Sequence, residues 1–358
     1  MSSGFTLGNL SVSIFGESHG KAIGAVIDGL PGGITLDFDK ILDFMARRAP
    51  KKDGTSTMRS EKDFPNVVSG LVDNVTTGTP LCAVIQNSDQ HSADYKSVSH
   101  LARPGHADYT GYVRYNKSND LRGGGHFSGR ITAPLVFAGA VAGQILEQKG
   151  VVTGAHILSI KDVHDDGFDP VNVSAEQLID VRSRYLPLIN SSVEDNMRGM
   201  ILSASQELNS VGGVIECCTV GMPVGVGSPM FDGIENRISQ LVFGVPAVKG
   251  IEFGAGFDVA TMTGKQNNDE FFMNNGEICT RTNNHGGILG GISSGMPIIF
   301  RVAIKPTPSI AQPQNTVDYT TMTDEVLNIK GRHDPCIVPR AVPCIEAAAN
   351  LALLSYFI

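Results

Sequence analysis

One segment, residues 133–148, is apolar on nearly every face and is followed closely by Gly150. Its length suits an α-helix, and a helix without a polar face has to be buried on all sides. Thr132 and Pro134 suit the N-cap and the first turn. The sequence therefore predicts a central helix whose N-terminus, the positive end of its dipole, is directed at the polar stretch that precedes it.

That polar stretch, residues 102–132, has almost no apolar periodicity, so we expect a long surface loop with a function. It contains Arg103, His106, Arg122 and Arg130, all of which can contact an anion. Residues 123–125 are all glycine, which lets the backbone adopt positive φ and bring N–H groups close to a phosphate at the helix N-terminus. A flexible glycine linker with incidental histidines is the alternative interpretation.

The 358 residues, 41% of them hydrophobic, are enough for one or two domains. A formal net charge of −8 argues against nucleic acid or an anionic membrane as a partner. An anion site must therefore be built from a local group of arginines. Those that stand in predicted loops or at helix ends beside glycines are Arg47, Arg48, Arg59, Arg103, Arg122, Arg130, Arg332 and Arg340. This concentration indicates a ligand with several negative charges.

The six cysteines form no C-x-x-C pair and most lie in apolar runs, which indicates reduced, buried thiols. The N-terminus lacks a basic region followed by an apolar stretch, and we expect no membrane span, which would need about 20 apolar residues. The predicted location is therefore cytoplasmic. No H-E-x-x-H motif or Cys/His quartet indicates a metal site, and no P-loop or dinucleotide-binding motif occurs.

The periodicity predicts strands at 7–15, 22–27, 66–74, 80–85, 151–160, 248–253 and 297–304, and helices at 37–48, 133–148 and 339–357. Capping boxes at Ser174-x-x-Gln177 and Ser191-x-x-Glu194 open two further helices. Strands and helices do not alternate strictly, which favours an α+β arrangement over a doubly wound parallel sheet. Residues 214–243 resemble residues 23–48 in their order of strand, Gly-Leu/Met-Pro-x-Gly and helix. We therefore predict one domain, residues 1–358, with two similar halves.

A serine hydrolase is one functional alternative. Residues 16–20, Gly-Glu-Ser-His-Gly, match the G-x-S-x-G nucleophile elbow after a predicted strand, and His285-Gly286-Gly287 could serve as an oxyanion loop. Against it, the elbow comes only 16 residues into the chain, and a strand instead of a helix is predicted to follow.

Two histidines are candidates for proton transfer. His19 and His106 each lie between small residues and glycine in a turn, a setting that suits proton transfer near neutral pH better than core packing. Residues 331–336 add an arginine and Asp334 just before the last helix. Residues 305–309 add a lysine and hydroxyl groups in a segment that two prolines stiffen.

Six segments resemble the signature segments of the chorismate synthase family, in that family's order and across nearly the whole chain. They are FGESHG at 15–20, RPGHADYT at 103–110, RGGG at 122–125, GGILGGISSG at 286–295, KPTPSI at 305–310 and GRHDPC with RAVP at 331–343. The resemblance implies a β-α-β sandwich of antiparallel sheets around helices, and a homotetramer. It also implies a lyase that uses reduced FMN, without consuming it, to eliminate phosphate from 5-enolpyruvylshikimate 3-phosphate. The product would be chorismate, at the end of the shikimate pathway.

The same resemblance assigns roles. His19 corresponds to the histidine that protonates the departing phosphate, and His106 to the one that protonates the reduced flavin near N1. Asp334 corresponds to the aspartate that helps the flavin N5 act as a base, and Ser18 and Ser128 to serines near flavin and substrate. The implied flavin-binding residues are His126, Phe127, Ser128, Pro246, Ala247, Gly290, Lys305, Pro306, Thr307, Pro308, Ser309 and Arg332. The implied substrate-binding residues are Arg48, Arg59, Arg130 and Arg340.

The chain departs from the family pattern after the three glycines. Many members have Arg-Ser-Ser there, whereas this chain has His126-Phe127-Ser128, and Gly129-Arg130-Ile131-Thr132 stands where they continue Ala-Arg-Glu-Thr. The sequence contains no added reductase domain, so we expect an external flavin reductase to supply reduced FMN. A non-catalytic flavin- or anion-binding protein is a third alternative. A separation of more than about 15 Å between His19 and His106 would favour it, because the proton-transfer groups would then not converge.

Overall fold

The computed structural model describes residues 3–50, 55–56, 63–87, 100–329 and 334–358. Its first sheet has five antiparallel strands in the order β1-β2-β3-β7-β4. These strands are β1 (Gly4–Leu7), β2 (Leu10–Gly16), β3 (Ala22–Asp28), β7 (Leu81–Gln86) and β4 (Asn66–Ser69). The predicted strand at residues 7–15 corresponds mainly to β2, which begins at Leu10, because Gly8, with a φ of 57°, lies in the turn between β1 and β2.

The second sheet also has five antiparallel strands, in the order β11-β16-β10-β8-β9. They are β11 (Val248–Phe253), β16 (Ile298–Ile304), β10 (Gly213–Val220), β8 (Val152–Ile160) and β9 (Val163–His164). Strand β8 is buried along most of its length because helices cover both of its faces.

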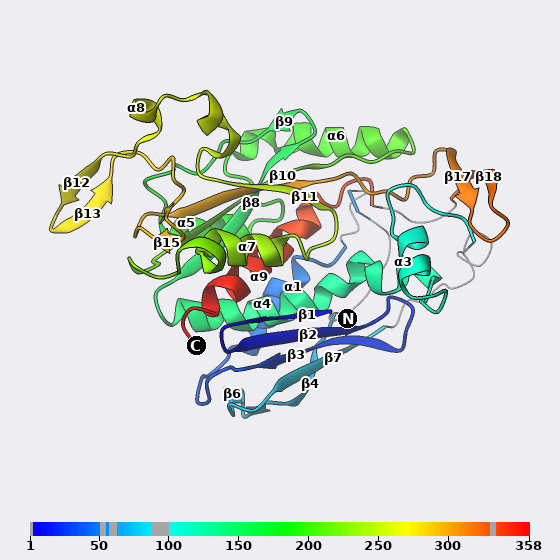
Figure 1. Cartoon of the computed structure of the whole chain (residues 1–358), viewed down its shortest axis with the longest axis horizontal. Helices are drawn as coiled ribbons and strands as arrows, with labels where there is room; N and C mark the ends of the chain where they lie inside the picture. The colour runs from blue at the N-terminus through cyan, green and yellow to red at the C-terminus, as the bar shows by residue number, and fades with distance from the viewer. Residues whose placement is uncertain (1–2, 51–54, 57–62, 88–99, 330–333) are drawn as a thin grey trace.

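Four helices lie between the two sheets (Figure 1). α4 (Thr132–Glu147) packs on the first sheet and α9 (Val338–Leu354) on the second, with α1 (Phe38–Ala46) against α4 and α7 (Ile234–Val242) against α9. α5 (Ala175–Ser183) and α6 (Glu194–Gln206) cover the outer side of the second sheet. The predicted sandwich of antiparallel sheets around helices is therefore confirmed.

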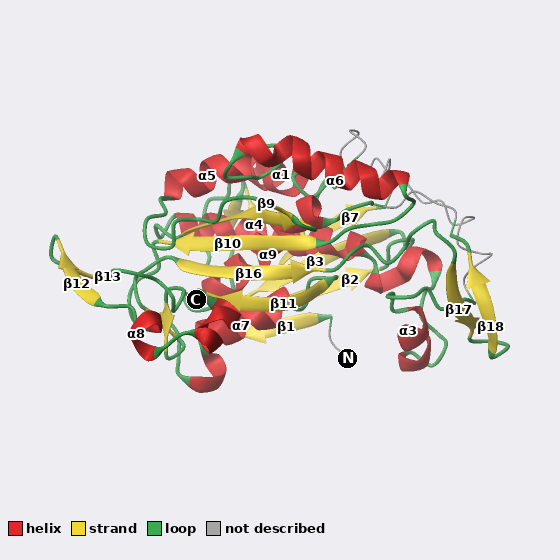
Figure 2. Cartoon of the chain, turned by 90° about the horizontal axis from the view of Figure 1, so that it is seen from above, coloured by secondary structure: helices red, strands yellow, loops and turns green. Residues whose placement is uncertain are grey.

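The remaining elements are small (Figure 2). At one end of the molecule lie α3 (Asp108–Arg114) and the hairpin β17 (Gln314–Asp318) and β18 (Thr323–Leu327), and at the other end the hairpin β12 (Phe271–Asn274) and β13 (Glu277–Thr280). Short pairs and turns complete the fold: β5 (Leu71–Val72) with β6 (Val75–Thr76), β14 (Ile288–Leu289) with β15 (Ile292–Ser293), and α8 (Gly264–Asn267).

Three local predictions need correction. The stretch 102–132 is not a continuous loop, because it contains the helix α3. Thr132 is the first residue of α4 and donates its hydroxyl to Gly129 O, so it does not cap the helix. Asn190 rather than Ser191 accepts the capping bond before α6, through a 3-10 turn at Ser191–Val193.

The segment Gly129–Glu147, which includes α4, is long and apolar enough to cross a membrane, in contrast to our expectation for the sequence. However, 78% of its most apolar window is buried inside the protein. Its composition is explained by its place between two sheets, since a helix covered on every side needs no polar face.

The two central helices are in direct backbone contact. A Cβ added at Gly139 of α4 would lie 2.2 Å from the Cβ of Ala347 and 2.3 Å from its Cα, in α9. A Cβ added at Gly143 would lie 2.6 Å from Nδ2 of Asn350. Both contacts advance along the two helices in the same direction, so α4 and α9 run parallel. Their N-termini therefore lie at the same end of the molecule.

We expect Gly139→Ala to lower the stability of the fold by about 1–3 kcal/mol, the usual cost of an added methylene in a packed core. The matched control is Gly199→Ala in α6, where nothing lies within 4 Å of the added Cβ. That control should raise stability by about 0.5–1 kcal/mol, because Ala favours helix more than Gly does. Thermal unfolding of both variants measures the difference, and equal midpoints would contradict the packing argument.

Candidate functional site

A cavity of about 800 Å³ lies at the N-terminal ends of α4 and α9. Its volume is within the range of small-molecule sites, roughly 300–1,000 Å³. One part of its wall is apolar and includes Leu135, Leu241, Val245 and Ile337. The cationic part consists of Arg48, Arg103, Arg130, Lys305 and Arg340. A cavity with such a wall suits a flat apolar group together with several anionic groups.

Most of the predicted site residues line this cavity. They are Arg48, His106, His126, Phe127, Ser128, Arg130, Pro246, Ala247, Lys305, Thr307, Pro308, Ser309, Asp334 and Arg340. Pro306 lies within the same segment but not on the wall, and Gly290 is exposed in the β14–β15 turn, away from the cavity wall. Arg59 and Arg332 lie outside the described residues.

His19 is buried in the turn between β2 and β3, directly behind the glycine segment. Its Nδ1 is 3.1 Å from the Oγ of Ser18, and that hydroxyl also donates to Arg122 O over 3.3 Å. A Cβ added at Gly123 would lie 2.1 Å from Cε1 of His19. Only glycine leaves room for the imidazole there, and Gly123, which lines the cavity, separates the ring from it.

Gly124 lies close to the ring of His106, as Gly123 does to the ring of His19, so that a side chain would not fit there either. A Cβ added at Gly124 would lie 2.9 Å from Cε1 and 3.0 Å from Nε2 of His106. Because consecutive Cα atoms are about 3.8 Å apart, the imidazoles of His19 and His106 lie within about 12 Å of each other. The proton-transfer candidates therefore converge, which argues against the non-catalytic alternative.

Asp108 connects His106 to Arg103. Its carboxylate accepts bonds from Nε of Arg103 at 2.7 Å, from NH2 at 2.6 Å and from the backbone N–H at 3.0 Å. Its Oδ1 is also 3.1 Å from Nδ1 of His106. Burial alone would raise the pKa of Asp108, but the bonds from Arg103, together with the nearby His106 ring, outweigh it and hold the pKa well below its usual value.

Asp63 joins two of the cavity arginines. It pairs with NH2 of Arg48 through one oxygen and with NH1 of Arg130 through the other, and all three side chains are almost completely buried. Burial would raise the pKa of Asp63, yet the two guanidinium groups more than offset it and lower the pKa. Asp334 is held in a similar way by NH1 of Arg340 at 2.5 Å, and Nε of Arg340 donates to Arg48 O.

The segment 305–309 offers polar groups to the cavity. Lys305 donates from Nζ to Gly105 O, and burial lowers the pKa of its ammonium group. The Oγ1 of Thr307 is buried and has no hydrogen-bond partner among the described residues. A buried hydroxyl without a partner is unfavourable, but this oxygen has almost no accessible surface, so a ligand in the cavity would reach it only after the side chain rotates.

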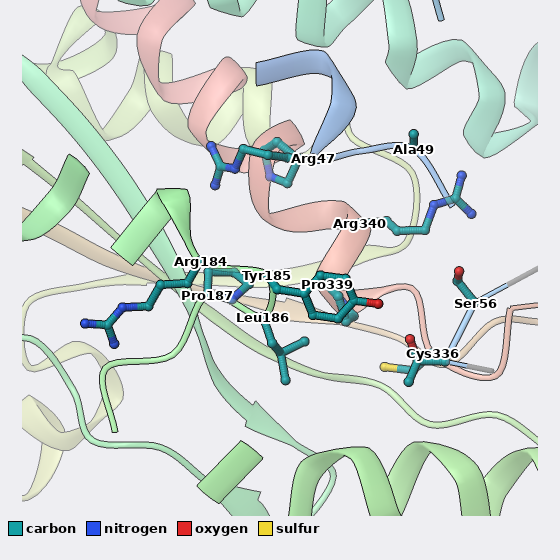
Figure 3. A pocket seen from close by; sticks show the side chains of 12 residues that line it. Arg47, Ala49, Ser56, Arg184, Tyr185, Leu186, Pro187, Cys336, Pro339 and Arg340 are labelled. Carbon is teal, nitrogen blue, oxygen red and sulfur yellow. The ribbon is translucent and has the colours of Figure 1, made fainter. Parts of the chain in front are cut away.

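Arg340 also lines a second, much smaller cavity of about 40 Å³ (Figure 3). Arg47 and Arg184 line it too, but both are engaged: Arg47 with the fully buried Glu346, and Arg184 with Asp180 and two backbone carbonyls. This space holds no more than a few water-sized groups. It is too small for the predicted ligands.

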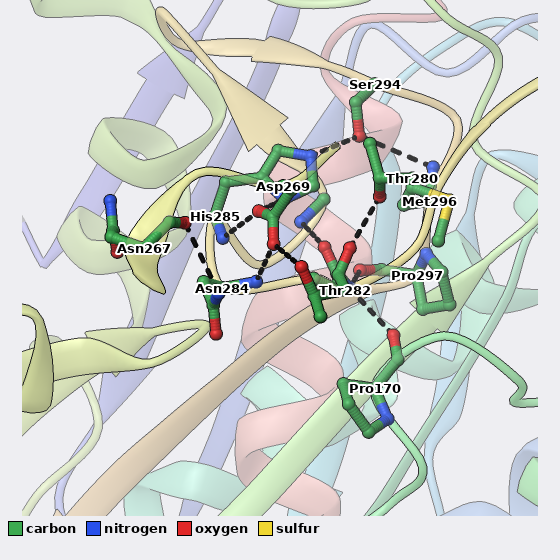
Figure 4. Close-up of polar contacts among 12 residues, drawn as sticks. Pro170, Asn267, Asp269, Thr280, Thr282, Asn284, His285, Ser294, Met296 and Pro297 are labelled. Carbon is green, nitrogen blue, oxygen red and sulfur yellow. Dashed lines mark hydrogen bonds and ion pairs between the residues drawn. The ribbon is translucent and has the colours of Figure 1, made fainter. Parts of the chain in front are cut away.

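The serine hydrolase alternative is not supported. Nε2 of His285 lies 3.1 Å from Oγ of Ser294, and its Nδ1 lies 2.7 Å from Oδ2 of Asp269, near the β12–β13 hairpin (Figure 4). The side-chain partners of His285 are therefore Ser294 and Asp269, and not the elbow residue Ser18. The N–H groups of Gly286 and Gly287 are bonded to O and Oδ1 of Asn283, so they are not available as an oxyanion hole. In addition, the elbow at Ser18 leads into β3, a strand.

Sequence reasoning missed the carboxylates that position the cationic side chains. Asp108 lies two residues after His106. Asp63 ends residues 57–63, which the family resemblance assigns to substrate binding without giving this carboxylate a positioning role. Local spacing does not identify the partners of Asp63, because this residue reaches Arg130, 67 positions away. Among the described residues, no group of three or more His, Cys, Asp and Glu side chains is arranged to hold a metal ion.

Comparisons with known proteins agree with the arrangement of the site. A sequence model of the chorismate synthase family matches residues 10–358. A chorismate synthase from Lancefieldella parvula is 44% identical over 356 residues, covering 96% of this chain and 93% of that protein. One from Thermococcus kodakarensis is 41% identical over 352 residues, covering 98% and 96%. A crystal structure of chorismate synthase has a TM-score of 0.76 at 27% identity and covers 98% of this chain and 92% of that one.

We expect Gly123→Ala to displace His19, because the added Cβ would overlap its ring. The matched control is Gly150→Ala, which has a similar positive φ, 79° against 59°, but no atom within 4 Å of the added Cβ. Both variants should lose stability through backbone strain, on the order of 1–2 kcal/mol. Only Gly123→Ala should shift the ring resonances of His19 in a histidine-labelled NMR spectrum. An unchanged His19 spectrum would show that Gly123 is not needed for clearance.

Proposed function

This chain belongs to the chorismate synthase family, and we propose that it eliminates phosphate from 5-enolpyruvylshikimate 3-phosphate in a 1,4 sense to give chorismate, with reduced FMN as cofactor. The observation that carries the proposal is the convergence of His19 and His106 at two consecutive glycines beside a cavity rich in arginine. A lyase that removes phosphate needs a group that protonates the leaving oxygen and cations that hold the anionic substrate.

The substrate would bind at the cluster of Arg48, Arg130 and Arg340, which is supported by its charge. The substrate carries one phosphate and two carboxylates, and guanidinium groups bind both kinds of anion through paired hydrogen bonds. Asp63 holds Arg48 and Arg130 in one orientation before any ligand binds. The resemblance assigns Arg59, which lies outside the described residues, to the same task.

FMN fits the rest of the cavity. The volume of about 800 Å³ accommodates a flavin together with a small substrate, and the apolar wall suits an isoalloxazine ring. Lys305, Thr307 and Ser309 would hold polar groups of the cofactor, because all three line the cavity. His126 and Phe127 would contact it from the glycine segment, and Pro246 and Ala247 from the loop before β11. When bound, reduced FMN supplies the electron-rich ring that assists loss of phosphate.

The residues of the chain would divide the proton chemistry. His19 would deliver a proton to the departing phosphate, and His106 would hold a proton beside the flavin ring. Asp334, fixed by Arg340, would act near the flavin N5, and Ser18 and Ser128 would support His19 and the ligands. Outside the site, we propose a homotetramer in the cytoplasm that depends on an external flavin reductase.

The test of this function is anaerobic turnover of 5-enolpyruvylshikimate 3-phosphate. With chemically reduced FMN we expect chorismate, and with NADPH and oxidised FMN we expect none. Absence of chorismate with reduced FMN would contradict the proposed reaction. Formation of chorismate with NADPH and oxidised FMN would contradict the dependence on an external reductase, while leaving the reaction itself in place.

The division of proton roles predicts different consequences for the two histidines. His19→Ala should slow phosphate release by about 10- to 1000-fold, the scale of one proton-transfer group, and leave the spectrum of the bound reduced flavin unchanged. His106→Ala should alter that spectrum when substrate binds, because a group near N1 affects the electron density of the ring. His164→Ala, at an exposed position in β9, is the control and should match the parent. Identical spectra and rates in all three variants would contradict the assignment.

A further inference from the structure

Two side chains contact the same ring nitrogen of His106, Nδ1, and a hydrogen bond to each would require a different protonation state of that nitrogen. NH2 of Arg103 is 3.3 Å from Nδ1, and Oδ1 of Asp108 is 3.1 Å from it. A guanidinium group has only donors, so its hydrogen bond to Nδ1 requires a lone pair there. A carboxylate only accepts, so a bond to Asp108 requires a proton on Nδ1. The tautomer of His106 therefore depends on which neighbour bonds to the ring.

The geometry favours Arg103. Its contact with Nδ1 satisfies the directional requirement of a hydrogen bond, whereas that from Nδ1 to Asp108 satisfies only a distance. Asp108, moreover, already accepts three bonds from Arg103, two at Oδ2 and one of 2.6 Å at Oδ1, the oxygen nearest His106. We propose that Arg103, oriented by Asp108, is a positioning residue that keeps the proton of the neutral His106 ring on Nε2, the edge that adjoins Gly124 and the cavity.

The surrounding fold keeps Arg103 and Asp108 from moving apart. Residues 101 and 102 pair with β17, through a bridge between Leu101 and Asp318 and a bond from Ala102 N to Val317 O. On the other side, α3 is anchored by the ring of Tyr112, 4.6 Å from that of Tyr319. Burial, followed by the nearby Asp108 carboxylate, raises the pKa of Tyr319 to about 12, so its hydroxyl stays neutral.

This arrangement gives Nδ1 a partner in both protonation states. The neutral ring accepts from Arg103, and the cationic ring donates Nδ1–H to Asp108, 3.1 Å away. In either state Nε2 carries a proton on the edge that adjoins the cavity. The inference rests on the proposed role of His106 and extends it, because a group that holds a proton beside a flavin ring needs that proton on this nitrogen.

The test is the tautomer of His106 in the full chain without substrate or flavin, from ¹⁵N NMR of histidine-labelled protein at a pH where the ring is neutral. We expect a protonated Nε2 and an unprotonated Nδ1 in the parent. In Arg103→Met the proton should move to Nδ1, because Asp108 is then the remaining charged neighbour of that nitrogen in the part of the chain that the structure describes. The His19 ring, bonded to Ser18 instead, should be unchanged and serves as an internal reference.

A parent ring with its proton on Nδ1 would overturn the proposal, and so would an Nε2 proton that persists in Arg103→Met. If Arg103→Met does not fold, Arg103→Lys is the second variant. It keeps the positive charge but lacks the planar guanidinium with its fixed donors, and a mixture of the two tautomers is the expected result. Asp232→Asn, which breaks a two-bonded pair with Arg237 far along the chain, controls for the general loss of an ion pair and should leave the His106 tautomer as in the parent. Because no turnover is measured, failure here is distinct from failure of the proposed reaction.

Discussion

The close contact between α4 and α9 determines the geometry of the site. Gly139 and Gly143 bring the backbones of two parallel helices together, so that both N-termini open on the same cavity. Arg130 lies just before α4, and Asp334 and Arg340 lie at the start of α9. Segments about 200 residues apart in sequence are thereby held side by side, and each sheet packs on one of the two helices. Two parallel helix dipoles repel each other, but both direct their positive ends at a cavity that suits anions.

The cationic side chains of this cavity are organised by carboxylates. Asp63 links Arg48 and Arg130, Asp108 holds Arg103, and Asp334 pairs with Arg340. An unpaired buried guanidinium is strongly unfavourable, so each arginine needs such a partner before a ligand arrives. The carboxylates also hold each arginine side chain in one rotamer. Less side-chain entropy is therefore lost when a ligand binds. Preorganisation of this kind lets a protein with a net charge of −8 keep a site for a multiply charged anion.

Much of the fold follows from local sequence, and most of the site does not. The apolar segment at 133–148 predicted the buried central helix, and alternation predicted β3, β8, β11 and β16 within a residue or two. Helix α3 was missed because its stability depends on Tyr319, which lies about 200 positions away. Motifs identified His19, His106 and Asp334, but the ion pair between Asp63 and Arg130 joins residues 67 positions apart, so local spacing could not predict it. Gly290, assigned by resemblance, lies outside the cavity wall in the described chain.

The three consecutive glycines belong to a family motif, and both the backbone conformation and the neighbouring atoms require glycine at these positions. Gly123, Gly124 and Gly125 have φ values of 59°, 93° and 54°, a run that side-chain-bearing residues adopt only with strain. Two of the three also stand against an imidazole, so a Cβ is excluded both by conformation and by contact. The segment thus acts as a spacer of fixed thickness between His19 and His106. Because it has no side chain, the two rings can pack against it from different elements, His19 at Gly123 and His106 at Gly124. Each ring keeps its own hydrogen-bond partner, Ser18 for one and Arg103 with Asp108 for the other, which is the physical condition for two separate proton-transfer roles within one site.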